Sequence, residues 1–199
     1  MAHKLNQFST IEYVFHQYIH IFIATFCCCI RAKIDLSRRG LGKEDAELIC
    51  TTLRCNPQIA ILKLCYNNFG DKGTSIIASG CAKEGRHHQN LTVLDLGFNC
   101  VGDEGCTALS LHTVVGNHTL RNLFLSGNHI TQKGAMALAS AILHGCSLSR
   151  INLSSNNLGP DGINVLSQSI REVETRVKLL LQRQGGICLL YTSPSPRDE

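Results

Sequence analysis

Apolar residues recur along the chain in one repeated pattern, which we call a frame. In each frame two apolar residues flank a single residue, and an asparagine lies three positions after the second apolar residue. The frame L-x-L-x-x-N ends at Asn67, Asn99, Asn128 and Asn156, so its copies are 32, 29 and 28 residues apart. Alternation of this kind is typical of a short strand with one buried side. The asparagine side chain can bond backbone groups where the chain turns away from the sheet.

Each asparagine is followed by a segment with helical spacing. Residues 134–143 (GAMALASAIL) place apolar side chains three and four positions apart and contain mostly strong helix formers. A degenerate frame starts at Ile34, with Arg39 in the asparagine position, and a further strand starts at Leu179, with Gln184 in that position. The pattern predicts five repeats of strand, turn, helix and loop, and the start of a sixth, stacked so that each repeat buries the face of its neighbour.

Two stretches of these repeats resemble a known family. Residues 91–99 (LTVLDLGFN) and 120–128 (LRNLFLSGN) are similar to leucine-rich repeats of the ribonuclease-inhibitor type, whose helix-bearing units have a period of about 28 residues. The resemblance covers residues 31–184. It implies an α/β fold: a curved leucine-rich-repeat solenoid of about five repeats, with parallel strands on the concave face and helices on the convex face. Similar repeats occur in ribonuclease inhibitor, in the sensing ends of nucleotide-binding innate immune receptors and in Ran GTPase-activating proteins.

The concave sheet is the candidate binding surface. Strand geometry turns the residue between the two leucines of each frame away from the core, and stacking assembles these residues into one extended face. Mixed charge and aromatic side chains on such a face suit a protein partner better than a polyanion. The candidate partner-binding residues are Asp35, Lys63, Tyr66, Asp95, Phe98, Phe124 and Asn152.

No motif indicates catalysis or a bound cofactor. The sequence has no G-x-x-x-x-G-K-[ST] loop and no G-x-S-x-G elbow. The recurring Gly-Asp-x-Gly at residues 70–73 and 102–105 is interpreted as structural, with the aspartate capping the coming helix and the glycine permitting the turn. His16 and His20 would share a helix face, but the H-E-x-x-H arrangement is absent. We therefore expect a protein that is not an enzyme and has no cofactor and no metal.

Charge and cysteine content indicate the class of partner and the cellular compartment. The 19 Lys and Arg residues against 15 Asp and Glu residues give a net charge of +4, which is too mild to indicate a nucleic-acid partner. The cysteines of the repeats are scattered without a C-x-x-C pair and are interpreted mostly as small buried hydrophobes of a reduced, cytoplasmic protein. Three N-x-[ST] sequons, at Asn90, Asn117 and Asn152, are expected to be unused.

The first 30 residues fall outside the repeats. Residues 14–30 contain no Asp, Glu, Lys or Arg, which leaves a membrane anchor open as one interpretation. A spanning helix needs about 20 predominantly apolar residues, and His16, Gln17 and His20 interrupt this segment. We favour an apolar cap or a mis-annotated extension over an anchor.

Residues 185–199 also carry no repeat signal. From Cys188 the sequence CLLYTSPSPRD resembles the in-frame translation of a transposase adapter used in sequencing-library preparation, with eleven consecutive codons matching. The hypothesis is that this tail is non-native and that the true chain continues from the sixth strand, since a solenoid needs a polar terminal cap. A disordered Ser/Pro tail is the alternative.

The repeats predict the function in outline: a noncatalytic, cytoplasmic protein-interaction module that binds a partner through its concave face. One alternative is the sensing region of a nucleotide-binding innate immune receptor. A second is a GTPase activator resembling the Ran type, although the resemblance supplies no matched functional residue for that activity. A third, a membrane-tethered receptor ectodomain, depends on residues 14–30 being an anchor.

Overall fold

The computed structural model describes residues 33–81, 90–115, 117–172 and 178–180. Strands of three residues in this part of the chain form one parallel sheet, in which each strand pairs with the next in chain order. They are β1 (Lys33–Asp35), β2 (Ile61–Lys63), β3 (Val93–Asp95), β4 (Asn122–Phe124), β5 (Arg150–Asn152) and β6 (Lys178–Leu180). Stacked repeats produce this order, because each repeat places one strand beside the strand of the repeat before it.

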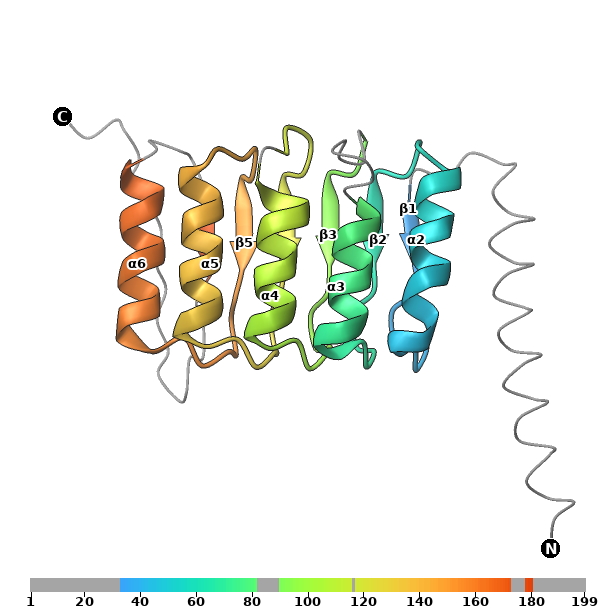
Figure 1. Cartoon of the computed structure of the whole chain (residues 1–199), viewed down its shortest axis with the longest axis horizontal. Coiled ribbons are helices and arrows are strands. Elements are labelled where there is room, and N and C mark those ends of the chain that lie inside the picture. Colours follow the sequence, from blue (N-terminus) through green and yellow to red (C-terminus); the bar gives the residue numbers. More distant parts are fainter. Residues whose placement is uncertain (1–32, 82–89, 116, 173–177, 181–199) are drawn as a thin grey trace, which may run out of the picture. The chain divides into compact units, whose positions relative to one another are not determined.

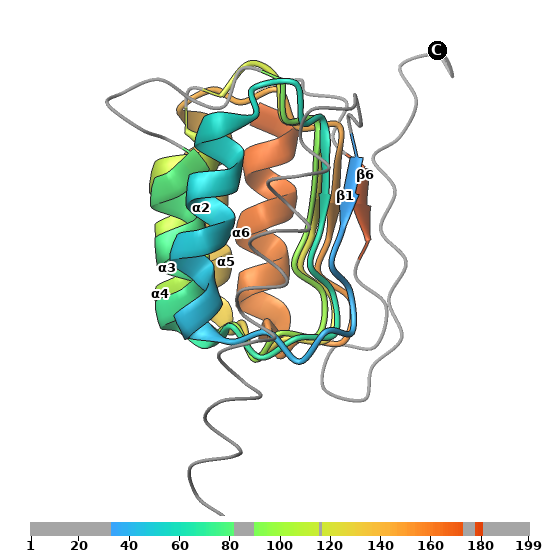
Figure 2. The ribbon, with the colours of Figure 1, turned by 90° about the vertical axis from the view of Figure 1, so that its right-hand side faces the viewer.

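A helical segment follows each strand from β1 to β5. These segments are η1 (Lys43–Asp45) with α2 (Ala46–Cys55), α3 (Gly70–Cys81), α4 (Asp103–Leu109) with the π-helical η3 (Ser110–Val114), α5 (Gln132–Leu143) and α6 (Gly159–Glu172). Figure 1 shows the helices side by side in the order α2 to α6, and Figure 2 shows helices and strands as two separate layers. The predicted α/β solenoid, with five strand–helix units and a sixth strand, is confirmed.

Leucine side chains from the L-x-L frames fill the space between the two layers. Leu62 and Leu64 are 1% and 0% exposed, and Leu94 and Leu96 are both 0% exposed. Burial of one such side chain stabilises the fold by roughly 1.5–3 kcal/mol relative to leaving it exposed. The helices supply the opposite wall, for example through Ile77 of α3, which is also fully buried. The predicted direction of the leucines is therefore confirmed.

The asparagines of the frame form a hydrogen-bonded ladder that joins each repeat to the one before it. In Asn128, Oδ1 accepts the N–H groups of Asn99 and Val101, both at 3.0 Å. Its Nδ2 donates to the carbonyls of Leu96 and Leu125 at 3.0 and 2.9 Å. The asparagines of the second and fifth repeats make contacts of the same kind. The sequence predicts bonds to the backbone at the turn, and the structure adds that many of the partners belong to the preceding repeat.

The aspartates of the Gly-Asp-x-Gly segments cap a different helix from the predicted one. Asp103 lies in the first turn of α4, yet its Oδ1 accepts the N–H groups of Thr131 and Gly134, at 2.8 and 2.9 Å, where α5 begins. Asp71 in α3 makes equivalent bonds to the start of α4. The prediction that each aspartate caps its own coming helix is wrong, because the first helical turn points the carboxylate sideways at the next repeat.

The glycines of these segments also divide into two kinds. Gly70 has φ +56°, the left-handed conformation that the predicted turn requires. Gly73 and Gly105, which end the two segments, instead lie inside α3 and α4 without positive φ. A Cβ on Gly105 would lie 2.8 Å from Oδ1 of Asp71 and 3.1 Å from its Cα. These two glycines are therefore needed for the close approach of neighbouring repeats, and their assignment to the turn is wrong.

The contacts of Asp103 predict that stability depends on pH. Burial alone would raise the pKa of Asp103, but hydrogen bonds from Thr131 and Gly134 and the charge of Lys133 lower it overall. Because the pKa is lower in the folded state, ionised Asp103 stabilises the fold above its ordinary pKa of 3.8 and loses this effect as the pH falls through the folded-state value. Asp103→Asn is expected to flatten the fall in melting temperature between roughly pH 4 and pH 2.

Circular-dichroism melting curves across this pH range measure the effect. The exposed neighbour Glu104 makes a matched control, since Glu104→Gln removes one carboxylate from the same turn of α4 without touching α5. An Asp103→Asn protein that is as sensitive to acid as the Glu104→Gln protein contradicts the prediction.

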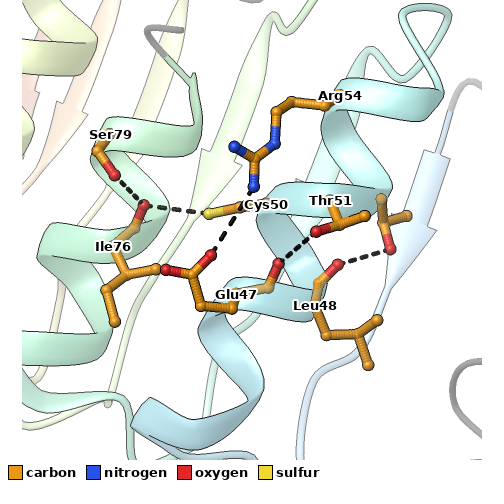
Figure 3. Close-up of polar contacts among 8 residues, drawn as sticks. Glu47, Leu48, Cys50, Thr51, Arg54, Ile76 and Ser79 are labelled. Carbon is orange, nitrogen blue, oxygen red and sulfur yellow. Dashed lines mark hydrogen bonds and ion pairs between the residues drawn. The ribbon is translucent and has the colours of Figure 1, made fainter.

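Helices α2 and α3 approach each other closely where Cys50 faces Gly80. The thiol of Cys50 donates to the carbonyl of Ile76 at 3.1 Å, and the hydroxyl of Ser79 donates to the same oxygen at 2.7 Å, as Figure 3 shows. A Cβ on Gly80 would overlap Sγ of Cys50 and lie 2.7 Å from its Cβ. Gly80 therefore sets the distance between these two helices.

Six cysteines among the described residues are free thiols that differ in burial. Cys50, Cys81 and Cys106 are buried, two others are half-buried and Cys100 is exposed. Burial raises the pKa of Cys50 to about 11 and that of Cys81 to about 12. Such thiols stay protonated at neutral pH and are poor nucleophiles. The interpretation of most cysteines as small buried hydrophobes is confirmed for Cys50, Cys81 and Cys106, whereas Cys100 is an exposed exception.

The sequon asparagine Asn117 is 3% exposed. Its Oδ1 accepts the N–H groups of Thr119 and Leu120, both at 2.8 Å, so the side chain holds the turn that precedes β4. Asn90, in contrast, is exposed. Of these two sequons, only the one at Asn90 presents a side chain that a glycosylating enzyme could reach.

No helix within the described ranges is long and apolar enough to cross a lipid bilayer. The predicted segments at residues 1–30 and 185–199, the candidate anchor at 14–30 and the end of the sixth frame at 181–184 all lie outside these ranges.

Candidate protein-binding face

The strand layer has one face against the helices and one face turned away from them, which we call the open sheet face (Figure 2). The third residue of each strand is also the residue between the two apolar residues of its frame. In the register of the sheet these residues are consecutive partners from β1 to β5. The structure thus brings five of the seven candidates into one row: Asp35, Lys63, Asp95, Phe124 and Asn152.

Charges of alternating sign occupy the first half of this row. The side-chain hydrogen bond from Ser37, at 2.7 Å, is the main cause that lowers the pKa of Asp35, with smaller contributions from Lys63 and Lys33. Burial raises the pKa of Asp95 above its ordinary value, although the Gly97 N–H and Lys63 act in the opposite direction. Lys63 therefore lies between two carboxylates, one of them in a drier environment than the other.

The turn after each strand fixes the direction of three side chains in the row. Asp35, Asp95 and Asn152 each accept the N–H group two residues further along the chain, at 3.3, 3.0 and 3.0 Å respectively. This local bond is typical of Asp and Asn at the start of a turn. The row is therefore held in place before any partner arrives, which lowers the entropy that binding would cost.

The other two candidates, Tyr66 and Phe98, lie beyond the row at the carboxyl ends of β2 and β3. Their rings are parallel within 4° and their centroids are 4.4 Å apart. The guanidinium of Arg38 lies 4.5 Å from the centroid of the Tyr66 ring. Tyr66 and Phe98 remain 44% and 41% exposed. We call Arg38, Tyr66 and Phe98 the rim stack.

Sequence reasoning finds the two aromatic residues of the rim stack but misses Arg38 and Gly127. All four precede the last position of a frame, and all four have positive φ, between 56° and 66°. A Cβ on Gly127 would overlap the ring of Phe98 and lie 2.8 Å from its Cγ. Gly127 therefore leaves room for Phe98 to lie flat over the next repeat. The signal available in the sequence is the shared position, one residue before Arg39, Asn67, Asn99 and Asn128.

The open sheet face and the rim stack offer several kinds of side-chain contact. Within the described ranges, no group of three or more His, Cys, Asp or Glu side chains is placed to hold a metal ion. The row offers carboxylates, an ammonium, an amide and a ring, and the rim stack offers a guanidinium and two rings.

Comparison with known proteins identifies the repeats. The family described as Leucine Rich repeat matches residues 87–110, 116–139 and 144–167. The chain is 36% identical over 162 residues to human NACHT, LRR and PYD domains-containing protein 5, an alignment that covers 76% of this chain. It is 28% identical over 170 residues to mouse ribonuclease inhibitor, covering 78% of this chain. The chain is a leucine-rich-repeat protein of the ribonuclease-inhibitor-like kind.

A solved structure agrees with this assignment. The leucine-rich-repeat protein superposes on "Leiomodin-1 Actin-Binding Site 2 (ABS2)" with a TM-score of 0.57 and 18% identity, over 72% of this chain and 83% of the other. At that identity the likeness concerns the fold alone. The resemblance to ribonuclease-inhibitor-type repeats is thus confirmed by the sequence comparisons, and the solved structure agrees with the fold.

The leucine-rich-repeat protein spans only part of its relatives. It covers 12% of the human NACHT, LRR and PYD domains-containing protein 5 and 34% of mouse ribonuclease inhibitor. It covers 14% of mouse NACHT, LRR and PYD domains-containing protein 14, to which it is 30% identical over 142 residues. The comparisons therefore concern the repeats that these relatives share with it.

Proposed function

We propose that this repeat array is a noncatalytic protein-interaction module that binds a protein partner through the open sheet face. The single observation that carries the proposal is the in-register row from Asp35 to Asn152, five side chains of mixed chemistry on a face that none of the helices in the described ranges covers. Repeat proteins use extended surfaces of this kind for binding. The relative named ribonuclease inhibitor acts on another protein, as its name states.

The chemistry of the row favours a protein over a nucleic acid. Nucleic-acid binding draws most of its affinity from cations that neutralise successive phosphates. Here Lys63 is flanked by Asp35 and Asp95, which would repel phosphates on both sides. A ring and an amide complete the row, and aromatic side chains are enriched at protein–protein interfaces.

The sensing region of a nucleotide-binding innate immune receptor is the second candidate. The identity of 36% to a protein whose name includes both NACHT and LRR domains favours it. In that case the same open sheet face would act within a longer chain, and a nucleotide-binding domain in the complete gene would decide the matter.

A cytoplasmic location is part of the proposal. It is supported by the thiols of Cys50, Cys81 and Cys106, which are free and buried between repeats. Reduced, unpaired cysteines are usual in the cytosol and unusual in secreted domains.

Replacement of three residues of the row tests the binding surface. Lys63→Ala, Asp95→Ala and Phe124→Ala together remove a cation, an anion and a ring from adjacent strands. We expect partners captured from cell lysate and quantified by mass spectrometry to fall at least tenfold, because a few central side chains carry most of the affinity of an interface.

A matched control removes a cation, an anion and an apolar side chain from the helix layer. Lys133→Ala, Glu104→Ala and Met136→Ala change exposed residues of α4 and α5. Capture that survives the first triple substitution, with the thermal unfolding of the protein unchanged, contradicts the proposed function. Capture that falls equally in both triple variants contradicts it as well, since the open sheet face would then have no special role.

A further inference from the structure

The rim stack leaves a specific part of each ring accessible. Because the repeats follow one another in chain order, Tyr66 lies between Arg38 and Phe98, at 4.5 and 4.4 Å from its ring centroid. Phe98 lies between Tyr66 and Gly127, whose missing Cβ leaves the space that the ring fills. Neighbours therefore lie over both faces of both rings, while Tyr66 and Phe98 remain 44% and 41% exposed. The ring edges are the parts of the rings that these neighbours leave uncovered.

The accessible groups of the rim stack attract negative charge. The edge of an aromatic ring carries the positive part of its quadrupole. Arg38 and its neighbour Arg39 are exposed, and the described residues contain no ion pair for either of them. Nearby carboxylates have other contacts: Asp35 accepts from Ser37, and Glu44 pairs with Lys43 at 3.6 Å.

We propose that the rim stack binds an acidic segment of the protein partner, with a carboxylate on the guanidinium of Arg38 and the segment running along the edges of Tyr66 and Phe98. This inference rests on the proposed function and specifies the chemistry of the partner. Arg binds carboxylates through two parallel hydrogen bonds, which fixes the orientation of the segment. The stack is ordered in advance, so little side-chain freedom is lost on binding.

A nucleic acid fits this site less well than an acidic peptide. Single-stranded nucleic acids bind aromatic side chains by stacking bases on ring faces. Neither face of Tyr66 or Phe98 is available for this, because the rings are 4.4 Å apart and their outer faces are covered by Arg38 and Gly127. An acidic peptide can also space its charges to avoid Asp35 and Asp95, whereas a phosphate backbone cannot.

Binding of a defined probe tests the inference. The probe is a fluorescein-labelled peptide of four Glu-Gly-Phe units, compared by fluorescence anisotropy with the same peptide containing Gln and with a labelled oligouridine RNA. We expect the protein to bind the Glu peptide at least tenfold more tightly than the Gln peptide and the RNA. Arg38→Glu is expected to weaken binding of the Glu peptide at least tenfold, and Phe98→Ala about fivefold.

Lys72→Glu is the matched control for Arg38→Glu. It changes the net charge equally but lies on the exposed side of α3, in the helix layer, and is expected to alter binding less than twofold. Circular-dichroism melting verifies that each variant is folded. Equal binding of the Glu and Gln peptides overturns the inference, as does tighter binding of the RNA or equal effects of Arg38→Glu and Lys72→Glu.

The two proposals fail in different ways. Capture of lysate partners that depends on Lys63, Asp95 and Phe124 but is unaffected by Arg38→Glu and by excess Glu peptide overturns the acidic-segment inference and leaves the proposed function standing. Capture that depends on none of these residues overturns both. Loss of capture in Arg38→Glu, together with competition by the Glu peptide but not the Gln peptide, supports both.

Discussion

Asn128→Ala is expected to lower the free energy of unfolding by about 4 kcal/mol, roughly twice the loss caused by Asn99→Ala. Asn128 and Asn99 are similarly inaccessible, at 5% and 0% exposure. The Asn128 side chain satisfies two N–H groups and two carbonyls within 3.0 Å. Each such buried group costs roughly 1–3 kcal/mol when it loses its partner and cannot reach water.

Asn99 differs from Asn128 in the hydrogen bonds that its side-chain oxygen accepts. Its Nδ2 donates to the carbonyls of Leu64 and Gly97, both at 3.0 Å. Its Oδ1 has no hydrogen-bond partner among the described residues. Asn99→Ala therefore leaves fewer backbone groups without a hydrogen-bond partner than Asn128→Ala does. The expected loss of unfolding free energy is accordingly smaller, about 2 kcal/mol.

Urea unfolding of both variants at neutral pH measures the difference. Two-state analysis of the urea curves gives each free energy directly, provided that the slope is unchanged. Equal destabilisation by the two substitutions would show that the N–H groups of Asn99 and Val101 gain nothing from Asn128, and the ladder would then act through its amide donors alone.

Gly80→Ala is expected to destabilise the protein by about 2 kcal/mol, although alanine is the better helix former by roughly 1 kcal/mol. The propensity gain is outweighed because the new methyl group would overlap Sγ of Cys50 and lie 2.7 and 3.2 Å from its Cβ and Cα. Backbone atoms cannot move aside as a flexible side chain can, so α2 and α3 must separate.

A double-mutant cycle isolates the contact. Cys50→Ala removes Sγ but keeps Cβ, so Gly80→Ala is expected to cost less in that background while still being unfavourable. Ser79→Ala, an exposed neighbour on α3, is the control and is expected to change stability by less than about 0.5 kcal/mol. A Gly80→Ala protein as stable as the parent would falsify the packing argument.

The sequence predicts the strand layer well because its signal is local. Alternation around Lys63 or Asp95 is enough to place a strand and to turn these residues away from the core, and the register of the sheet then assembles the row. The asparagine frame predicts the turn for the same reason. What the frame omits is the donor and acceptor partners in the preceding repeat, which depend on how closely the repeats stack.

The errors concern contacts between repeats. Asp103 is of a residue type, and lies at a position, that suit a cap for its own helix. Its carboxylate instead accepts hydrogen bonds from Thr131 and Gly134 of the next repeat. The stacking of Arg38 on Tyr66 likewise needs the left-handed φ of both residues, which a pattern of apolar positions does not encode. Side-chain direction in such turns follows from backbone conformation and not from residue type.

The residue before the last position of each frame has a left-handed backbone conformation, which restricts the substitutions by which this protein could acquire a new partner. Arg38, Tyr66, Phe98, Gly127 and Ser155 all hold φ between 56° and 66°. Valine, isoleucine and threonine are strongly disfavoured in that conformation. Residues of the row, which have extended backbone, can therefore be replaced by any residue type to change the specificity. The five left-handed positions accept only side chains that are not branched at Cβ. A library for engineering new binders should allow all residue types in the row and exclude Val, Ile and Thr at the five left-handed positions.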